Sequence, residues 1–121
     1  VTGGCVVVGE DGEVWWNGCN GCQRGIEDEA GRCEDREQKY PLICHAEENA
    51  IMHAARTGVS LKGNVAFVTL PPCSRCSRSL IQAGISEVVY PAGIDIPERW
   101  EEDFSIAMSM MEEAGITVRQ A

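Results

Sequence analysis

Two short motifs in this sequence combine residue types that bind metal ions. His45 and Glu47 stand two residues apart at the start of an alanine-rich run, and Cys73 and Cys76 form a Cys-x-x-Cys pair after two prolines. That cysteine spacing lets two thiolates share one metal ion. At the first turn of a helix, the positive end of the helix dipole favours the thiolate form, which binds zinc. His45, Cys73 and Cys76 would leave a zinc ion one open position, as in a catalytic site, and Glu47 could reach a water molecule there.

The elements that must position these residues alternate between strands and helices. Asp11-Gly12 predicts a hairpin turn between strands at 6–8 and 14–16, and the polar stretch 19–42 is typical of a functional loop. The expected order after it is helix 46–57, strand 64–70, helix 73–83, strand 86–91, helix 101–115 and strand 116–120. This alternation predicts one α/β domain over residues 1–121, a three-layer α/β/α sandwich with a mixed, mostly parallel five-stranded sheet. Both motif helices follow strands, so their N-termini should meet at one edge of the sheet.

Composition and charge argue against some classes of partner. The chain has 121 residues and a net charge of −9, with 19 acidic and 10 basic residues. Such a surface repels polyanions, which argues against long nucleic acids, a folded tRNA included. The apolar runs are too short to span a membrane, and no secretory signal is visible. The seven cysteines are an odd number, so we expect a cytoplasmic protein with reduced thiols.

The motif pair, His-x-Glu followed by Pro-Cys-x-x-Cys, is the signature of zinc-dependent nucleobase deaminases. The sequence resembles the cytidine and deoxycytidylate deaminase superfamily, and within it the deoxycytidylate (dCMP) deaminase branch. The stretches that carry the resemblance are NGCQRGIED, DREQKYPLICHAEENAI, VTLPPCSRC and LIQAGISEVVYP. The resemblance implies a cytidine-deaminase-like fold, a Zn²⁺ cofactor and hydrolysis of dCMP to dUMP and ammonia. Glu47 would then move protons from water to the ring nitrogen and to the departing amine.

A glycine-containing loop holds the candidate substrate residues Asn20, Gly21 and Arg24. An amide and a guanidinium on a flexible backbone suit a sugar hydroxyl and a phosphate. The resemblance implies that Asn20 contacts the deoxyribose, that Arg24 contacts the 5′-phosphate, and that Gly21 and Ala46 belong to the same substrate site. A solvated loop with a surface arginine is the alternative.

The sequence departs from the family pattern at two places. Cys19 and Cys22 form another Cys-x-x-Cys pair with Cys33 nearby, which could hold a second, structural zinc, although packed reduced thiols are the simpler interpretation. Family members also commonly have a helix before the first strand, and this sequence shows none. The sheet face that this helix would cover is expected to lie against another subunit, unless the chain is a fragment. Since neighbouring subunits generally close the pockets in this superfamily, we expect a homo-oligomer that binds a small nucleotide.

Two other functions stay open from the sequence. A deaminase of this kind could act on a free nucleoside or base, such as cytidine, cytosine or a guanine-type base, because the pocket-lining side chains do not follow from the sequence. A non-catalytic relative could use zinc only to hold its fold as an assembly subunit. Glu47 favours catalysis, because a purely structural zinc site does not need that carboxylate.

Overall fold

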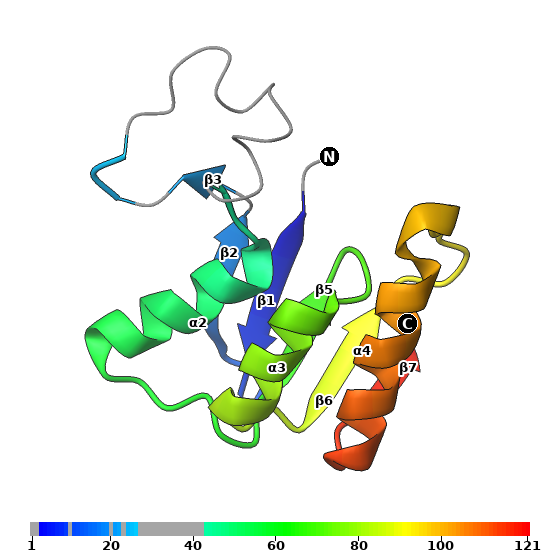
Figure 1. The fold of residues 1–121 in the computed structure, drawn as a ribbon. Helices are drawn as coiled ribbons and strands as arrows, with labels where there is room; N and C mark the ends of the chain where they lie inside the picture. Colours follow the sequence, from blue (N-terminus) through cyan, green and yellow to red (C-terminus); the bar gives the residue numbers. More distant parts are fainter. Residues whose placement is uncertain (1–2, 10, 20, 23, 27–42) are drawn as a thin grey trace.

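The computed structural model describes residues 3–9, 11–19, 21–22, 24–26 and 43–121. Its strands are β1 (Gly4–Val8), β2 (Val14–Cys19), β3 (Gly21–Cys22), β4 (Ile43–Cys44), β5 (Val65–Val68), β6 (Glu87–Tyr90) and β7 (Thr117–Gln120). Its helices are α2 (Ala46–Thr57), α3 (Ser74–Ala83), the short 3-10 helix η1 (Glu98–Trp100) and α4 (Glu101–Glu113). Figure 1 shows how these elements follow one another along the chain. None of the helices in the described ranges is both long and apolar enough to cross a membrane.

Five strands form the main sheet, in the order β2-β1-β5-β6-β7. β1 runs antiparallel to both β2 and β5, whereas β5, β6 and β7 are parallel to one another. β1 alone therefore opposes the other strands, and the predicted mixed five-stranded sheet of an α/β fold is confirmed. The hairpin between β1 and β2 turns at Asp11-Gly12, where Gly12 has a φ of 80° that glycine adopts at little steric cost.

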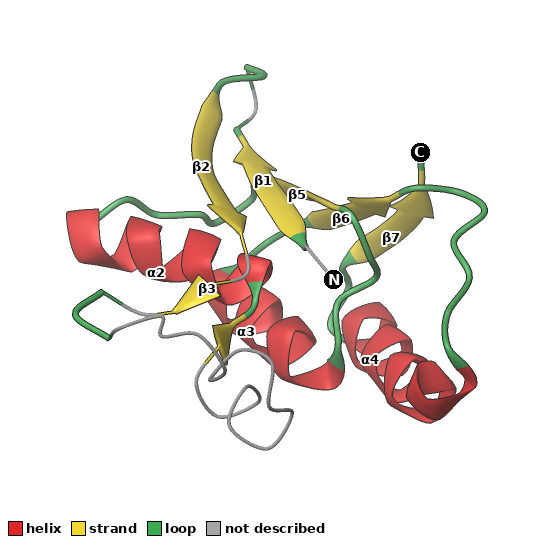
Figure 2. Ribbon diagram, turned by 90° about the horizontal axis from the view of Figure 1, so that it is seen from above, coloured by secondary structure: helices red, strands yellow, loops and turns green. Residues whose placement is uncertain are grey.

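The three α-helices α2, α3 and α4 lie on one face of this sheet, as the view from above in Figure 2 shows. The units β5-α3-β6 and β6-α4-β7 are parallel crossovers that advance in the same direction across the sheet. Crossovers of one hand then place both helices on the same side. The sequence predicts helices on both faces, and the second helical layer is not among the elements that the structure describes.

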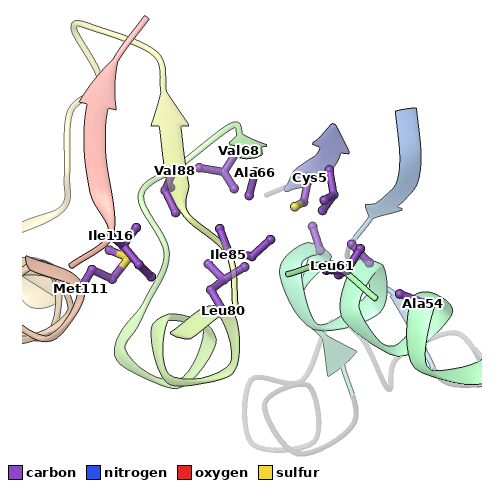
Figure 3. Packing of buried hydrophobic residues seen from close by; sticks show 13 residues of the cluster. Cys5, Ala54, Leu61, Ala66, Val68, Leu80, Ile85, Val88, Met111 and Ile116 are labelled. Atoms are coloured by element: carbon purple, nitrogen blue, oxygen red, sulfur yellow. The ribbon is translucent and has the colours of Figure 1, made fainter. Parts of the chain in front are cut away.

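The hydrophobic core lies between the sheet and these helices (Figure 3). Alternate side chains of β1 and β5 point into it, because successive side chains of a strand point to opposite faces; these are Cys5, Val7, Ala66 and Val68. Leu80 of α3 and Met111 of α4 are fully buried in the same core. The core therefore holds β5, the strand that precedes α3, in a fixed position relative to α3 and α4.

α2 lies in direct backbone contact with β2. A Cβ atom placed on Gly18 of β2 would lie 2.3 Å from the carbonyl oxygen of Ala46 and 2.8 Å from the backbone nitrogen of Ala50. The close approach is possible because α2 presents alanines to the sheet and β2 presents a glycine there. This contact seats the first turn of α2 against the sheet, and that turn carries Glu47.

The observed boundaries match the predicted ones where the sequence carries start and stop signals. α2 spans the predicted 46–57 and ends at Gly58, whose φ is 78°. α3 begins one residue after the predicted start, because Cys73 is its N-cap. The predicted loop at 19–42 needs a correction, because β2 extends to Cys19 and Gly21–Cys22 pairs with Ile43–Cys44. Strands of two residues are too short to show an alternating pattern.

Candidate metal centre

The first turns of α2 and α3 meet beside the end of β5. Pro71 and Pro72 follow β5 after two intervening residues and cannot extend its ladder, since proline lacks the N–H that a sheet ladder needs. Cys73 is the N-cap of α3, with extended backbone angles of φ −69° and ψ 172°. His45 is the N-cap of α2, with similar angles of φ −70° and ψ 159°. Both side chains therefore stand at helix ends, where unpaired backbone N–H groups create a positive local potential.

The structure brings His45, Cys73 and Cys76 together. Nδ1 of His45 lies 3.5 Å from Sγ of Cys73 and 3.4 Å from Sγ of Cys76. Around a tetrahedral zinc ion, Zn–S bonds of about 2.3 Å and Zn–N bonds of about 2.0 Å put nitrogen and sulfur ligands roughly 3.5 Å apart. The donor set and its spacing therefore fit Zn²⁺. Among the described residues, this is the group of three such side chains that lies close enough to hold a metal ion.

The two thiols of this cluster differ in their ionisation. The pKa of Cys73 is lowered to about 4, chiefly by a hydrogen bond from the Cys76 thiol and, against the effect of burial, also by one from His45. The pKa of Cys76 is raised, because its thiol donates that hydrogen bond and because it is buried. Zinc binding requires both thiolates, so it is coupled to release of the proton that the two thiols share. The contact with Cys73 also raises the pKa of His45.

Glu47 lies beside this cluster in the first turn of α2, with 9% of its surface exposed. Burial raises the pKa of its carboxyl, and a hydrogen bond with Cys76 opposes that shift. A carboxyl whose pKa moves toward neutrality can both accept and donate a proton during a reaction. Glu47 is not one of the three grouped side chains, and a hydrogen bond joins its carboxyl to Cys76.

One residue of the predicted substrate loop, Gly21, is paired with the strand that leads into His45. Gly21 of β3 pairs with Cys44 of β4, and Cys44 directly precedes His45. Arg24 follows β3, and its side chain is exposed. The pairing of β3 with β4 therefore places Gly21 beside the strand that leads into His45, and Arg24 follows three residues later along the chain.

The structure describes the other predicted site residues only in part. Ala46 is completely buried, so only its backbone could face a ligand. Asn20 and Cys33 lie outside the described residues. The side chains of Cys19 and Cys22 also lie outside the described part, so the second zinc stays a prediction.

Three residues next to the cluster were missed by sequence reasoning. Glu48 accepts a hydrogen bond from the backbone N–H of His45 at 3.3 Å and pairs with Arg75 at 2.8 Å. Asp103 of α4 accepts hydrogen bonds from the backbone N–H of Ser74 at 2.9 Å and from its hydroxyl at 2.6 Å. The spacing of Glu48 after an N-cap residue is that of a capping box and could have indicated it. The contact of Asp103 joins residues 29 apart in the chain, and no local pattern signals it.

Known proteins are similar to this chain in sequence and in fold. The family model of the cytidine and deoxycytidylate deaminase zinc-binding region matches residues 1–92. Human deoxycytidylate deaminase is 35% identical over 124 residues, a match that covers 97% of this chain and 66% of the human protein. Deoxycytidylate deaminase of Saccharomyces cerevisiae is 37% identical over 124 residues, covering 97% of this chain and 37% of the yeast protein. The crystal structure of dCMP deaminase from the cyanophage S-TIM5, in complex with dCMP and dUMP, matches with a TM-score of 0.79 and 28% identity, covering 98% of this chain and 80% of the phage chain.

The match differs in extent between these relatives. The chain spans about two thirds of the length of the human protein and just over a third of the yeast protein. The matched region 1–92 contains His45, Glu47, Cys73 and Cys76. The chain therefore belongs to the cytidine and deoxycytidylate deaminase family and carries its zinc-binding region.

Proposed function

We propose that the protein is a zinc-dependent deaminase that hydrolyses dCMP to dUMP and ammonia. The observation that carries this proposal is the convergence of Nδ1 of His45 and the sulfurs of Cys73 and Cys76 beside the buried carboxyl of Glu47. Three ligands of this kind suit a catalytic zinc with one open position. The human and yeast relatives are deoxycytidylate deaminases, and the phage enzyme binds dCMP and dUMP, which favours a nucleotide substrate.

In this mechanism Glu47 carries the protons. Zinc, when bound, lowers the pKa of water toward ~7 and so supplies a nucleophile at neutral pH. Glu47 accepts a proton from the attacking water and delivers it to the ring nitrogen beside the carbon that bears the amine. A second proton passes through the same carboxyl to the amine, which leaves as ammonia while the oxygen of the water becomes the new carbonyl. Burial around Glu47 raises its pKa and helps the carboxyl to hold each proton between these transfers.

We assign substrate selection to the loop that contains Asn20, Gly21 and Arg24. Arg24 would bind the 5′-phosphate, since a guanidinium matches phosphate geometry. Asn20 would contact the deoxyribose, and the backbones of Gly21 and Ala46 would line the same pocket. The pairing of Gly21 with Cys44, next to His45, supports this assignment.

The first experiment compares ammonia release from dCMP, deoxycytidine and cytosine by the zinc-loaded protein. We expect the unaltered protein to prefer dCMP strongly. In Arg24→Gln the KM for dCMP should rise, while the KM for deoxycytidine should change little. Activity on deoxycytidine or cytosine alone would keep the zinc chemistry and discard the nucleotide as substrate. Equal activity on dCMP and deoxycytidine would contradict the role of Arg24.

A second experiment tests whether the protein is an enzyme or a zinc-stabilised assembly subunit. Glu47→Gln should lower turnover by about 100-fold or more, since general acid–base groups contribute about 10²–10⁴-fold. It should still bind one zinc ion, because Glu47 is not in the ligand group. Glu113→Gln, at the exposed far end of α4, is the control and should keep full activity. Turnover that survives in Glu47→Gln would refute the proton-carrying role.

We also propose a homo-oligomer. Phe67 alternates along β5 with core residues and is 42% exposed, on the sheet face opposite the three described α-helices. Burial of this side chain against another subunit would remove apolar surface from water. Light scattering should give a mass that is a multiple of 13.2 kDa, and a monomer would contradict this proposal.

The cytoplasm is our proposed compartment. A zinc site with two thiolates needs reduced cysteines, and oxidising compartments favour disulfides instead. Cys5, Cys73 and Cys76 are not disulfide-bonded. Cell fractionation would test the assignment, and recovery in a secreted fraction would contradict it.

A further inference from the structure

One ion pair joins the two helix starts that carry the candidate metal ligands. Nη2 of Arg75 lies 2.8 Å from Oε1 of Glu48. Arg75 stands between Cys73 and Cys76 in the first turn of α3, and Glu48 stands three residues after His45 in the first turn of α2. The pair therefore connects the element that presents the histidine to the element that presents the two thiols.

The carboxylate of Glu48 makes a second contact with the same oxygen. Oε1 also accepts the backbone N–H of His45 at 3.3 Å. A continuous path thus runs from the backbone of His45 through Glu48 to the guanidinium of Arg75. This path does not include the side-chain atoms that would bind the metal. It holds in place the residues to which those atoms belong.

We propose that Glu48 and Arg75 are positioning residues of the metal centre, which hold the first turns of α2 and α3 at the separation that zinc binding requires. The proposal rests on the zinc site of the proposed function and extends it to a pair that neither binds the metal nor touches the reacting atoms. The Nδ1-to-Sγ distances of 3.5 and 3.4 Å depend on where α2 sits relative to α3. A shift of α2 relative to α3 would change this spacing, and metal-to-ligand distances in a fitted site are held to within about 0.2 Å.

The exposure of the pair separates this role from a general stabilising one. The side chain of Arg75 is 46% exposed and that of Glu48 is 22% exposed. An ion pair so accessible to water contributes little to folding. Partners that orient metal ligands, by contrast, typically change metal affinity by about 10–100-fold when they are removed.

The charge of Arg75 offers a competing explanation, since a guanidinium near two thiols could favour their ionised forms directly. The two explanations differ in how Arg75 depends on Glu48. If Arg75 acts through Glu48, removing both side chains costs no more zinc affinity than removing Glu48 alone. If Arg75 acts on the thiols by its own charge, the two losses multiply.

The experiment is a double-mutant cycle on zinc affinity, with Glu48→Ala, Arg75→Ala and the combined variant. The dissociation constant of zinc is measured by competition with a chelator, and the Co²⁺-substituted proteins report ligand geometry through their visible absorption. We expect each single variant to bind zinc about 10-fold or more weakly, and the combined variant to match Glu48→Ala. Glu48→Gln keeps an oxygen that can accept both contacts and should recover most of the affinity.

Controls keep folding and activity apart from positioning. Arg78→Ala removes an exposed arginine from the next turn of α3 and should leave zinc affinity unchanged. A merely structural role would lower the Tm measured in chelator without weakening zinc binding. Zinc affinities of Glu48→Ala and Arg75→Ala within twofold of the unaltered protein would overturn the proposal, and so would losses that multiply. A protein that binds zinc but deaminates nothing would refute the proposed function alone, whereas one that binds no zinc would overturn both.

Discussion

Cys5 of β1 shows how the surroundings of Glu47 act on a single residue. Its side chain is 2% exposed and belongs to the core. Burial, and secondarily the charge of Glu47, raises the pKa of its thiol from 9.0 to about 12. The thiol is therefore neutral and unreactive in the folded protein across the physiological range. Its role is that of a small apolar side chain of the core.

Cys5 should make the stability of the protein fall at high pH. Below pH 9 the thiol is neutral in both the folded and the unfolded chain, so it adds no pH dependence. Between its ordinary pKa of 9.0 and its folded value of about 12, the unfolded chain ionises and the folded chain does not, which favours unfolding by about 1.4 kcal/mol per pH unit. Urea unfolding between pH 8 and 11, in excess chelator, should show a steeper decline for the unaltered protein than for Cys5→Ala. Parallel curves would contradict the raised pKa.

At the scale of single elements, the sequence predicts the two helices of the site better than it predicts their neighbours. α2 and α3 carry polar starts, apolar periodicity and a terminal glycine, so Gly58 and Gly84 end them as predicted. The strands β3 and β4 were not predicted, because they form through pairing between distant segments and not through local pattern. Local signals therefore identify the helices that carry the candidate ligands, while long-range contacts decide what surrounds them.

The contact between β2 and α2 leads to a prediction for Gly18. In Gly18→Ala the new Cβ would lie 2.3 Å from the carbonyl oxygen of Ala46, so α2 must move away from the sheet. Overpacking of this kind typically costs about 1–3 kcal/mol, and the short contact with backbone atoms leads us to expect the upper end of that range in the free energy of unfolding measured with urea. Gly4→Ala is the matched control, because its Cβ would meet only Thr69 at an ordinary 3.4 Å. Equal stability of the two variants would show that α2 has room to shift freely.

The contact between α4 and α3 leads to a second prediction at this scale. Asp103 binds the backbone N–H and the hydroxyl of Ser74, at the first position of α3. Asp103→Ala removes both hydrogen bonds to a charged acceptor and should lower the free energy of unfolding by about 2 kcal/mol. Asp103→Asn keeps an acceptor oxygen and should lose less than half of that. A loss that is the same in both variants would mean that the charge, and not the hydrogen bonding, is what α3 requires.

At the scale of the whole molecule, sequence motifs locate the chemistry and the fold brings it together. His45 and Cys73 are 28 residues apart in the chain, and their meeting was expected on the reasoning that both helices follow strands of one sheet. In the structure α3 follows β5 of the main sheet, whereas α2 follows β4 of the two-stranded sheet. The layer arrangement was harder to predict, because alternating strands and helices do not specify on which face each crossover falls. Order along the sheet decides this, and it places α2, α3 and α4 together. The site is therefore assembled from helices of a single layer.

That assembly predicts that zinc stabilises the molecule as a whole. A metal ion bound by His45, Cys73 and Cys76 would tie α2 to α3 in the folded chain only, so its binding free energy adds to the stability. The free energy of unfolding should rise by about 1.4 kcal/mol for each tenfold increase in free zinc above the dissociation constant, reaching about 4 kcal/mol at a thousandfold excess. Urea unfolding in zinc-buffered solutions measures this slope. Cys76→Ser removes a ligand without adding bulk at a buried position and should flatten the slope toward zero at the same zinc concentrations. A slope that persists in Cys76→Ser would place the stabilising metal elsewhere in the chain. A flat response in the unaltered protein would show that zinc binding at this centre does not stabilise the fold.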